Sequence, residues 1–264
     1  MIMKDLFSLK DRVAVVTGGS RGIGKMIAQG FLEQGAKVYI TARKAPACDQ
    51  AAEELSALGG TCVSLPHDLS TLEGIDKFVE EFGANENGLD ILVNNAGAAW
   101  GEDFATFPES GWDKVMDLNV KSPFFLTKAL HGQLKKRASA DAPSKVINIA
   151  SIDGVRINPW ETYSYQASKA AMIHLTRRMA ARLIKDQIAV SAIAPGAFAS
   201  DMNRAARDAG DTVGKMVPAG RIGEDSDMAG TAVYLASRAG NYVVGETVAV
   251  DGGVAYSSTG ESWG

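Results

Sequence analysis

Short apolar segments alternate with segments of helical periodicity along nearly the whole chain. The first apolar segment, Arg12–Thr17, is unbroken, rich in valine and followed at once by glycines, which is typical of a buried strand. Gly22–Gln34 then carries apolar residues at helical spacing, and Gly35 follows it as a helix-terminating glycine. The same alternation predicts further strands at Lys37–Thr41, Thr61–Pro66, Leu89–Asn94, Lys145–Ala150, Ile188–Ala194 and Thr247–Val250. It predicts helices at Gln50–Leu58, Leu72–Phe82, Tyr163–Asp186 and Ser226–Ser237, and a long, mostly helical stretch at Trp112–Arg137.

This alternation determines the expected fold class. Strands that are apolar throughout suit a parallel sheet whose two faces are both covered by helices. We therefore expect a Rossmann-type, doubly wound α/β fold, with three layers in a single domain over residues 1–264 and a core over 8–254. Residues 196–223 lack a strong apolar pattern and are expected to form a substrate lid. The tail 255–264 is polar, and its Trp263 is either an interface anchor or part of a frayed end.

Composition and charge exclude several classes of protein. The 264 residues carry a formal net charge of −4, without the basic excess of a nucleic-acid-binding protein. The two cysteines, Cys48 and Cys62, lack the spacing of a zinc site, so we expect no metal and a reducing, cytoplasmic location. No apolar run is long enough to span a membrane, and charges interrupt the first residues too early for a signal peptide.

A glycine-rich loop joins the first predicted strand to the first predicted helix. Gly18 permits a tight turn, while Gly22 and Gly24 let the backbone approach a bound pyrophosphate at the helix N-terminus. Ser20 and Ile23 belong to the same loop and are expected to contact the cofactor. A purely structural glycine turn is the alternative, but the loop lies in the strand–turn–helix context that dinucleotide binding requires.

The residues after the second and third strands indicate which dinucleotide binds. An NAD-binding protein usually places an acid at the end of the second strand, whereas this chain has Arg43 there and Arg21 in the glycine loop. Two guanidinium groups suit the 2′-phosphate of NADP(H), although each arginine alone could be a solvated surface charge. Asp68, followed by Leu69, is placed to accept a hydrogen bond from the adenine amino group or, alternatively, to cap a helix.

Tyr165 and Lys169 lie four residues apart and therefore share one helix face. A free phenol, with a pKa of about 10, exchanges protons poorly near neutrality. A neighbouring ammonium and a positive nicotinamide ring would lower that pKa, and the phenol could then act as an acid–base group toward a carbonyl or alcohol. The same spacing is common on ordinary helix surfaces, so the pair depends for its meaning on the rest of the chain.

The rest of the chain supplies that context. The loop TGGSRGIG, the segment Asn94–Gly97, the Tyr165/Lys169 pair, Pro195-Gly196 and the closing Asp251-Gly252-Gly253 resemble the classical group of the short-chain dehydrogenase/reductase family. The resemblance covers roughly residues 8–254, with the motifs in family order. It implies an NADP(H)-dependent oxidoreductase that acts on a small-molecule carbonyl substrate as a homotetramer or homodimer.

The resemblance also implies roles for individual residues. Tyr165 is similar to the catalytic acid–base of the family, and Lys169 to the lysine that lowers the tyrosine pKa and binds the nicotinamide ribose. Ser151 resembles the serine that hydrogen-bonds the substrate oxygen, and Asn119 the asparagine that holds a proton-relay water. Tyr163 has no lysine four positions later and is not expected to take part. Further cofactor contacts are implied at Asn95, Gly97, Pro195, Gly196, Phe198 and Ser200.

The substrate is less closely defined. Several segments, among them NNAGAAWGEDF and SGWDKVMDLNV, look similar to rhamnolipid-pathway β-ketoacyl reductases and to 3-oxoacyl-[acyl-carrier-protein] reductases. This favours a β-ketoacyl thioester or β-keto ester, although Asp186 stands where carrier-dependent members often have an arginine. A general carbonyl reductase, a sugar or secondary-alcohol dehydrogenase and a non-catalytic NADP(H)-binding regulator are the alternatives. The expected apolar pocket wall, which could equally be core, comprises Ile152, Val155, Ile157, Trp160, Met202, Met216 and Val217.

Overall fold

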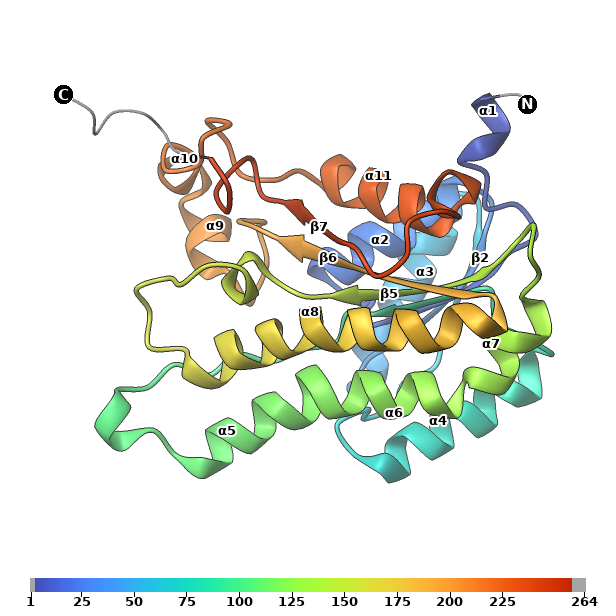
Figure 1. Ribbon diagram of the computed structural model, residues 1–264, viewed down its shortest axis with the longest axis horizontal. Helices are drawn as coiled ribbons and strands as arrows, with labels where there is room; N and C mark the ends of the chain where they lie inside the picture. Colours follow the sequence, from blue (N-terminus) through green and yellow to red (C-terminus); the bar gives the residue numbers. More distant parts are fainter. Residues whose placement is uncertain (1–2, 258–264) are drawn as a thin grey trace.

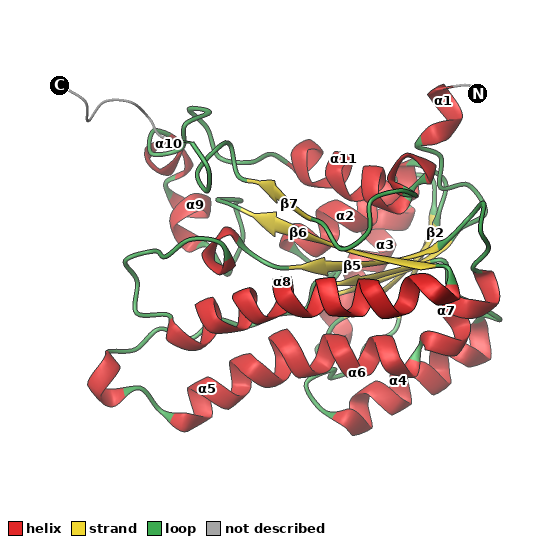
Figure 2. Ribbon diagram, viewed as in Figure 1, coloured by secondary structure: helices red, strands yellow, loops and turns green. Residues whose placement is uncertain are grey.

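The seven predicted strands pair side by side, all in parallel, in the order β3-β2-β1-β4-β5-β6-β7 (Figure 1). This computed structural model describes residues 3–257. Helices cover both faces of the sheet (Figure 2), so the predicted three-layer, doubly wound fold is confirmed. The strands are β1 (Val13–Thr17), β2 (Lys37–Thr41), β3 (Thr61–Ser64), β4 (Ile91–Asn94), β5 (Ser144–Ile149), β6 (Ile188–Pro195) and β7 (Thr247–Val250).

The two helical layers have different members. One face of the sheet packs against α2 (Gly22–Glu33), α3 (Ala45–Ser56) and α11 (Asp225–Ala236). Against the other face lie α4 (Leu72–Asn85), α5 (Glu109–Met116), α6 (Ser122–Ala129), α7 (His131–Arg137) and α8 (Tyr163–Leu183). Shorter helices in the described residues are α1 (Met3–Leu6), α9 (Arg204–Asp208) and α10 (Gly210–Gly214). Single turns of 3-10 helix occur at η1 (Phe104–Thr106), η3 (Ile152–Gly154), η4 (Ile184–Asp186) and η5 (Arg238–Gly240).

Strand β1 shows why these strands are apolar at every position. Its five residues are all buried. Ala14 and Val16 enter the core beneath α2 and α11, while Val13 and Val15 enter the core beneath α4 and α6. Successive side chains of a strand point to opposite faces, so a sheet covered on both sides must be apolar on both.

The predicted mostly helical stretch Trp112–Arg137 is confirmed, and the structure shows that it consists of several pieces. The structure divides this stretch into α5, a π-helical turn η2 (Asp117–Lys121), α6 and α7. Apolar periodicity does not distinguish one long helix from shorter pieces joined end to end, because each piece keeps the same inward face. Pro123 lies in the first turn of α6, directly after the π-helical turn η2.

Other boundaries differ by a few residues. Helix α3 begins at Ala45 rather than Gln50, because Pro46 occupies its first turn instead of preceding it. The expected irregular stretch 196–223 contains the two short helices α9 and α10. Trp263 lies outside the described residues. Within the described part of the chain, no helix has the length and apolar character needed to cross a bilayer.

Strand order reverses between β1 and β4, and a crevice at the carboxyl ends of these strands is where open α/β sheets bind ligands. The loops that follow the two strands meet there, since the backbone N–H of Asn95 donates a 2.9 Å hydrogen bond to Thr17 Oγ1. The fold therefore gathers the glycine loop and the segment after β4 at one edge of the sheet.

Candidate active site

The glycine loop has the shape that a bound pyrophosphate needs. Gly18 and Gly22 have φ values of +65° and +52°, which favour glycine. A Cβ on Gly24 would lie 2.3 Å from the Gly18 carbonyl oxygen, so the helix starts too close to the loop for any side chain there. No side chain caps the N-terminus of α2, and its first turn contains no acid. Its N–H groups and the positive end of its dipole are thus left to an anion.

Asn95 stabilises the glycine loop from below. Its Nδ2 donates to the carbonyl oxygens of Thr17 and Gly18, at 2.7 and 3.2 Å. The Thr17 hydroxyl in turn accepts hydrogen bonds from the backbone N–H groups of Asn95 and Ala96, both at 2.9 Å. Asn95 therefore holds the loop in shape with its side chain. Thr17 was not predicted as a site residue, although it is a polar residue that ends an otherwise apolar strand, which is a recognisable signal.

The two predicted phosphate-binding arginines are both exposed beside the crevice. Arg43 follows β2 directly. Arg21, at the start of α2, forms an ion pair with Asp201, and Asp201 also pairs with Arg207 at 2.7 Å. The glycine loop is thus tied to the lid segment through an exposed pair, which contributes little to stability.

Asp68 and Leu69 follow β3 as predicted, but the capping alternative for Asp68 is wrong. The carboxylate of Asp68 accepts hydrogen bonds from the backbone N–H and hydroxyl of Ser70, at 3.0 and 2.7 Å. Thr71 is the residue that caps α4, accepting from the N–H of Gly74 at 3.0 Å. Leu69 is buried in the core, so its side chain is not available to a cofactor.

Tyr165, Lys169 and Ser151 come together where α8 crosses the end of β5. Lys169 is buried, and its Nζ donates a 2.8 Å hydrogen bond to the Ile149 carbonyl oxygen. The same Nζ lies 5.6 Å from the centroid of the Tyr165 ring. Ser151 is buried at the end of β5, and its hydroxyl accepts from the N–H of Asp153 at 3.1 Å. One phenol, one hydroxyl and one ammonium thus face the same space.

The protein's own groups do not produce the lowered phenol pKa that the sequence predicts. Burial raises the pKa of Tyr165 to about 12, the Ser151 hydroxyl opposes this, and the Asp153 carboxylate adds to it. Burial also lowers the pKa of Lys169 to about 8, against a smaller opposing effect of Asp153. Burial is therefore the largest influence on the pKa of both side chains in the protein alone.

Asn119 lies in the π-helical turn η2 and is buried. Its Oδ1 accepts from the N–H of Ala98 at 2.8 Å, while its Nδ2 donates to the Ala98 carbonyl oxygen at 2.9 Å and to Ser168 Oγ at 3.0 Å. A Cβ on Gly97 would lie 3.2 Å from Asn119 Oδ1. Asn119 thus joins the loop after β4 to the helix of Tyr165. Single π-turns are frequent at functional sites, and apolar periodicity gave no sign of this one.

The segment after β6 lies beside the glycine loop. The N–H of Gly196 donates to the Val250 carbonyl oxygen at 2.9 Å, which fixes the exit of the chain after Pro195. Phe198 is buried against Gly223, so its ring belongs to the core and is not available to a cofactor. Ser200 accepts from the N–H of Asn203 at 3.1 Å, and a Cβ on Gly22 would lie 3.3 Å from its Cβ.

Comparison with known proteins identifies the family. A family model described as enoyl-(acyl carrier protein) reductase matches residues 18–255. The rhamnolipids biosynthesis 3-oxoacyl-[acyl-carrier-protein] reductase of Pseudomonas aeruginosa is 46% identical over 254 residues, covering 95% of this chain and 99% of that protein. This chain belongs to the short-chain dehydrogenase/reductase family.

Two further proteins match over nearly the same length of this chain. The 2-dehydro-3-deoxy-D-gluconate 5-dehydrogenase of Dickeya dadantii is 39% identical over 254 residues, covering 94% of this chain and 96% of that protein. Among solved structures, the RhlG/NADP active-site complex of Pseudomonas aeruginosa matches with a TM-score of 0.91 at 45% identity, over 94% of this chain and 98% of that one. Nearly the whole of this short-chain dehydrogenase/reductase is therefore shared with proteins of different named substrates.

Apolar side chains surround the site of this short-chain dehydrogenase/reductase without being buried. The expected wall residues lie in the loop between Ser151 and Tyr165 and in the lid, at the same end of the sheet (Figure 1). Two of them, Ile152 and Val217, are core residues, which corrects that part of the expectation. The others are exposed to between about one third and nine tenths, at Val155 (36%), Met202 (52%), Trp160 (63%), Met216 (72%) and Ile157 (88%).

Residues 3–257 contain no cluster of three or more histidine, cysteine, aspartate or glutamate side chains that could hold a metal ion. The arrangement instead offers two hydroxyl groups and a buried ammonium beside an uncapped helix N-terminus. Such a set can bind an anion at one end of the crevice and hydrogen-bond a carbonyl oxygen at the other.

Proposed function

We propose that the protein is an NADP(H)-dependent oxidoreductase that reduces the ketone of a β-ketoacyl thioester or β-keto ester to a secondary alcohol. The observation that carries the substrate class is the exposed apolar rim, in which Ile157, Trp160 and Met216 are each more than half exposed. Exposed side chains of this size gathered around one crevice are typical of a site that binds an apolar ligand. An acyl chain would cover them, whereas a polyol would leave them in water.

The residues present fit NADP(H). The uncapped N-terminus of α2 and the turn at Gly18–Gly24 suit the pyrophosphate, and Arg21 and Arg43 lie at the crevice edge for the 2′-phosphate. The further contacts that we propose are Ser20, Ile23, Asp68, the backbone of Leu69, Asn95, Gly97, Lys169, Pro195, Gly196, the backbone of Phe198 and Ser200. When bound, the cofactor supplies the reducing equivalent.

In the proposed mechanism, Ser151 and Tyr165 hold the substrate oxygen. Both hydroxyl groups can donate to it, and Tyr165 passes its proton to that oxygen as negative charge develops there. Lys169 keeps Tyr165 in place from beneath its ring and is held by the Ile149 carbonyl. Asn119 fixes α8 through Ser168, and the relay water expected at Asn119 stays a prediction.

A sugar-type substrate is the second candidate, because the Dickeya dadantii relative is named for a deoxy-gluconate. A general carbonyl reductase and a non-catalytic NADP(H)-binding regulator are further alternatives. NADPH consumption should be measured with acetoacetyl-CoA, an acetoacetate ester, 5-keto-gluconate and a simple aliphatic ketone. We expect the highest kcat/KM with the first two. Preference for the keto-sugar would contradict the β-ketoacyl proposal, and no turnover with any of them would favour the regulator.

Ile157 allows the proposed contact between the apolar rim and an acyl chain to be tested directly. Replacing Ile157 by Ser should raise the KM for a long β-ketoacyl thioester and leave that for acetoacetyl-CoA nearly unchanged, because only the longer chain reaches the rim. Leu58→Ser is the matched control, since Leu58 is 56% exposed just after α3, away from the site. Equal effects on both substrates would contradict an acyl-chain contact.

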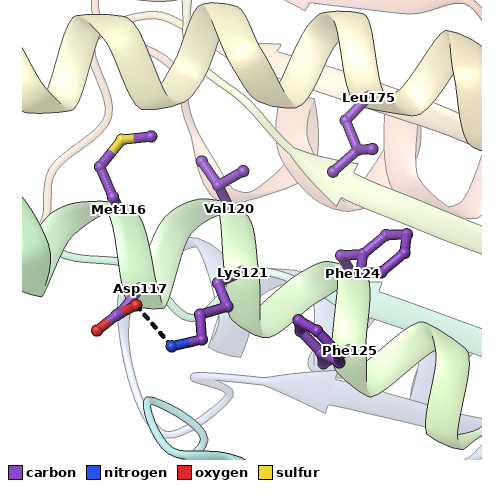
Figure 3. Close-up of a pocket in the computed structure, with 7 residues that line it drawn as sticks. All are labelled: Met116, Asp117, Val120, Lys121, Phe124, Phe125 and Leu175. Atoms are coloured by element: carbon purple, nitrogen blue, oxygen red, sulfur yellow. Dashed lines mark hydrogen bonds and ion pairs between the residues drawn. The ribbon is translucent and has the colours of Figure 1, made fainter.

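A second apolar surface supports a proposal for the quaternary state. A pocket of about 320 Å³ lies on the outer side of the α5–η2–α6 stretch and α8, lined among others by Val120, Phe124 and Leu175 (Figure 3). Trp112 and Phe124 on these helices are about two-fifths exposed, at 42% and 41%. We propose that this surface packs against a second copy in a homodimer or homotetramer.

Sedimentation of the Phe124→Glu variant tests this surface, since a carboxylate inside an apolar interface should dissociate the oligomer. The exposed Leu58→Glu variant is the control and should sediment like the wild type. A monomeric wild type would contradict the proposal.

We also propose a cytoplasmic location, since Cys48 and Cys62 are both free and buried, as suits a reducing compartment.

A further inference from the structure

A second, polar cavity lies at the opposite end of the sheet from the proposed active site. Its volume is about 270 Å³, and the N-terminal segment, the start of β5 and the end of α11 enclose it. Strand β5 enters the sheet here and leaves it at the other end, just before Ser151. Neither the cofactor contacts nor the apolar rim includes any residue of this cavity.

The charges that line this cavity are unbalanced. Lys10, Arg12, Lys145 and Arg238 contribute four positive side chains, and Asp5 contributes the one carboxylate among the lining residues. This excess of three positive charges occurs in a protein whose formal net charge is −4. A concentration of one charge sign in a concave, partly enclosed site focuses the field on an ion of the opposite sign.

The acid nearest to these cations is already occupied. Asp90 is buried and pairs with Arg12 at 2.7 Å and with Arg137 at 3.0 Å. Its Oδ2 also accepts from the N–H of Val13 at 2.9 Å. Both oxygens are therefore engaged with other groups, and Asp90 forms no ion pair with Lys145 among the described residues.

Lys145 is the residue that makes this cavity unusual. Its side chain is 3% exposed, and its Nζ is buried with no hydrogen-bond partner in the part of the chain that the structure describes. A buried charge without a partner is costly, and proteins normally pair such a group or place it beside a ligand. The backbone of Lys145 is an ordinary part of β5, so the strand does not need a lysine at this position.

We propose that this cavity is a binding site for a small polyanion of the phosphate or polycarboxylate class, held by Lys145, Arg12 and Arg238. A divalent or trivalent anion would offset the charge excess, whereas a single chloride would leave most of it. Guanidinium groups bind the planar or tetrahedral oxygens of such anions well, and Asn241 at the rim adds a polar neighbour. The site is separate from the cofactor crevice and does not depend on the proposed reaction.

Binding there should stabilise the folded protein, because the site exists only when β5, α11 and the N-terminal segment are together. The test measures thermal unfolding and calorimetric binding with pyrophosphate and with citrate, each against sodium chloride at equal ionic strength. Saturating NADPH is present throughout, so that the cofactor crevice is filled and cannot bind the added anion. The variants are Lys145→Met, which keeps the length of the side chain, and Arg238→Gln at the exposed rim. Lys77→Met, on the exposed face of α4 and paired with Glu73, is the matched control.

We expect one anion per chain, a higher melting temperature and at least about tenfold weaker binding in both cavity variants, as for the loss of a charged hydrogen bond. Lys77→Met should bind like the wild type. Binding of pyrophosphate alone would assign the phosphate class, and binding of citrate alone the polycarboxylate class. Binding that survives unchanged in Lys145→Met and Arg238→Gln would place the anion elsewhere on the protein and overturn the proposal. No effect of either anion beyond that of chloride would overturn it as well.

Discussion

Lys169 holds its Nζ 5.6 Å from the centroid of the Tyr165 ring while donating a 2.8 Å hydrogen bond to the Ile149 carbonyl oxygen. The lysine thus connects β5 to the phenol from beneath. It therefore holds the Tyr165 ring in place relative to the strand that ends just before Ser151.

Replacing Tyr165 by Phe keeps the ring above Lys169 and removes the hydroxyl. Turnover should fall by about 10²–10⁴, as expected for the loss of a general acid. Affinity for NADPH, measured by fluorescence titration, should change little. Tyr163→Phe is the control, because the Tyr163 hydroxyl instead bonds the Glu161 carboxylate at 2.8 Å on the surface. Near-normal turnover in Tyr165→Phe would mean that the proton comes from another group.

The ionisation of Tyr165 should depend on the cofactor's charge. In the protein alone, burial raises the pKa of Tyr165 to about 12, from a usual value of 10.0. A positive nicotinamide ring stabilises the phenolate and should lower this pKa, whereas the neutral reduced ring should not. Absorbance of tyrosinate, taken as the difference between wild type and Tyr165→Phe, should therefore appear at lower pH with NADP⁺ than with NADPH. Identical titrations would contradict this coupling.

Arg43→Ala should narrow the preference for NADPH over NADH. The expected loss is about 1–3 kcal/mol of discrimination, the contribution of a charged hydrogen bond to the 2′-phosphate. Binding of NADH should be unchanged, because it lacks that group. Arg178→Ala, an exposed arginine on α8, serves as the control. Equal wild-type affinities for the two cofactors would contradict the NADP(H) assignment.

The free energy of unfolding should show that the buried, charged Lys145 side chain destabilises the folded protein. Burial lowers the pKa of Lys145 from 10.5 to about 8, with a smaller contribution from the charge of Arg12. Below pH 8 the lysine is charged in both the folded and the unfolded chain, so the folded state carries the full penalty. Lys145→Met should therefore be more stable by about 1–3 kcal/mol at neutral pH in a buffer without polyvalent anions.

The stability advantage of Lys145→Met over the wild type should shrink as pH rises from 8 to 10.5, since the wild-type lysine loses its proton in the folded state first. Urea unfolding at several pH values would measure it. The control Lys77→Met removes an exposed lysine and should show no such dependence. A Lys145→Met variant that is less stable than the wild type at neutral pH would mean that Lys145 has a partner that offsets its burial.

The lid should exchange its amide hydrogens faster than the strands. Between the buried anchors Phe198 and Val217, most side chains of residues 199–216 are exposed, and the link to Arg21 is a surface ion pair. NADP(H) should slow exchange there, because the lid borders the glycine loop. Exchange in the free protein as slow as in β5 and β6 would contradict the assignment of a lid.

The sequence by itself determined the strands, their parallel pairing and the glycine loop. These features are local or periodic: an unbroken apolar strand requires helices on both faces, and positive φ at Gly18 and Gly22 requires glycine. The Tyr165/Lys169 pair was likewise predictable, since four residues on a helix place both side chains on one face. Family resemblance then gave Ser151 and Asn119 their proposed roles.

Only the tertiary structure decided how these groups are supported. The π-turn at Asn119 keeps the same inward face as an ordinary helix and leaves no trace in the periodicity. The raised pKa of Tyr165 depends on burial by segments distant in sequence, which outweighs the opposing effect of the Ser151 hydroxyl. The unpaired ammonium of Lys145 arises because Asp90, its neighbour in space, is already bound by two arginines from other elements. Burial and competition for partners are properties of the assembled chain, so no local pattern encodes them.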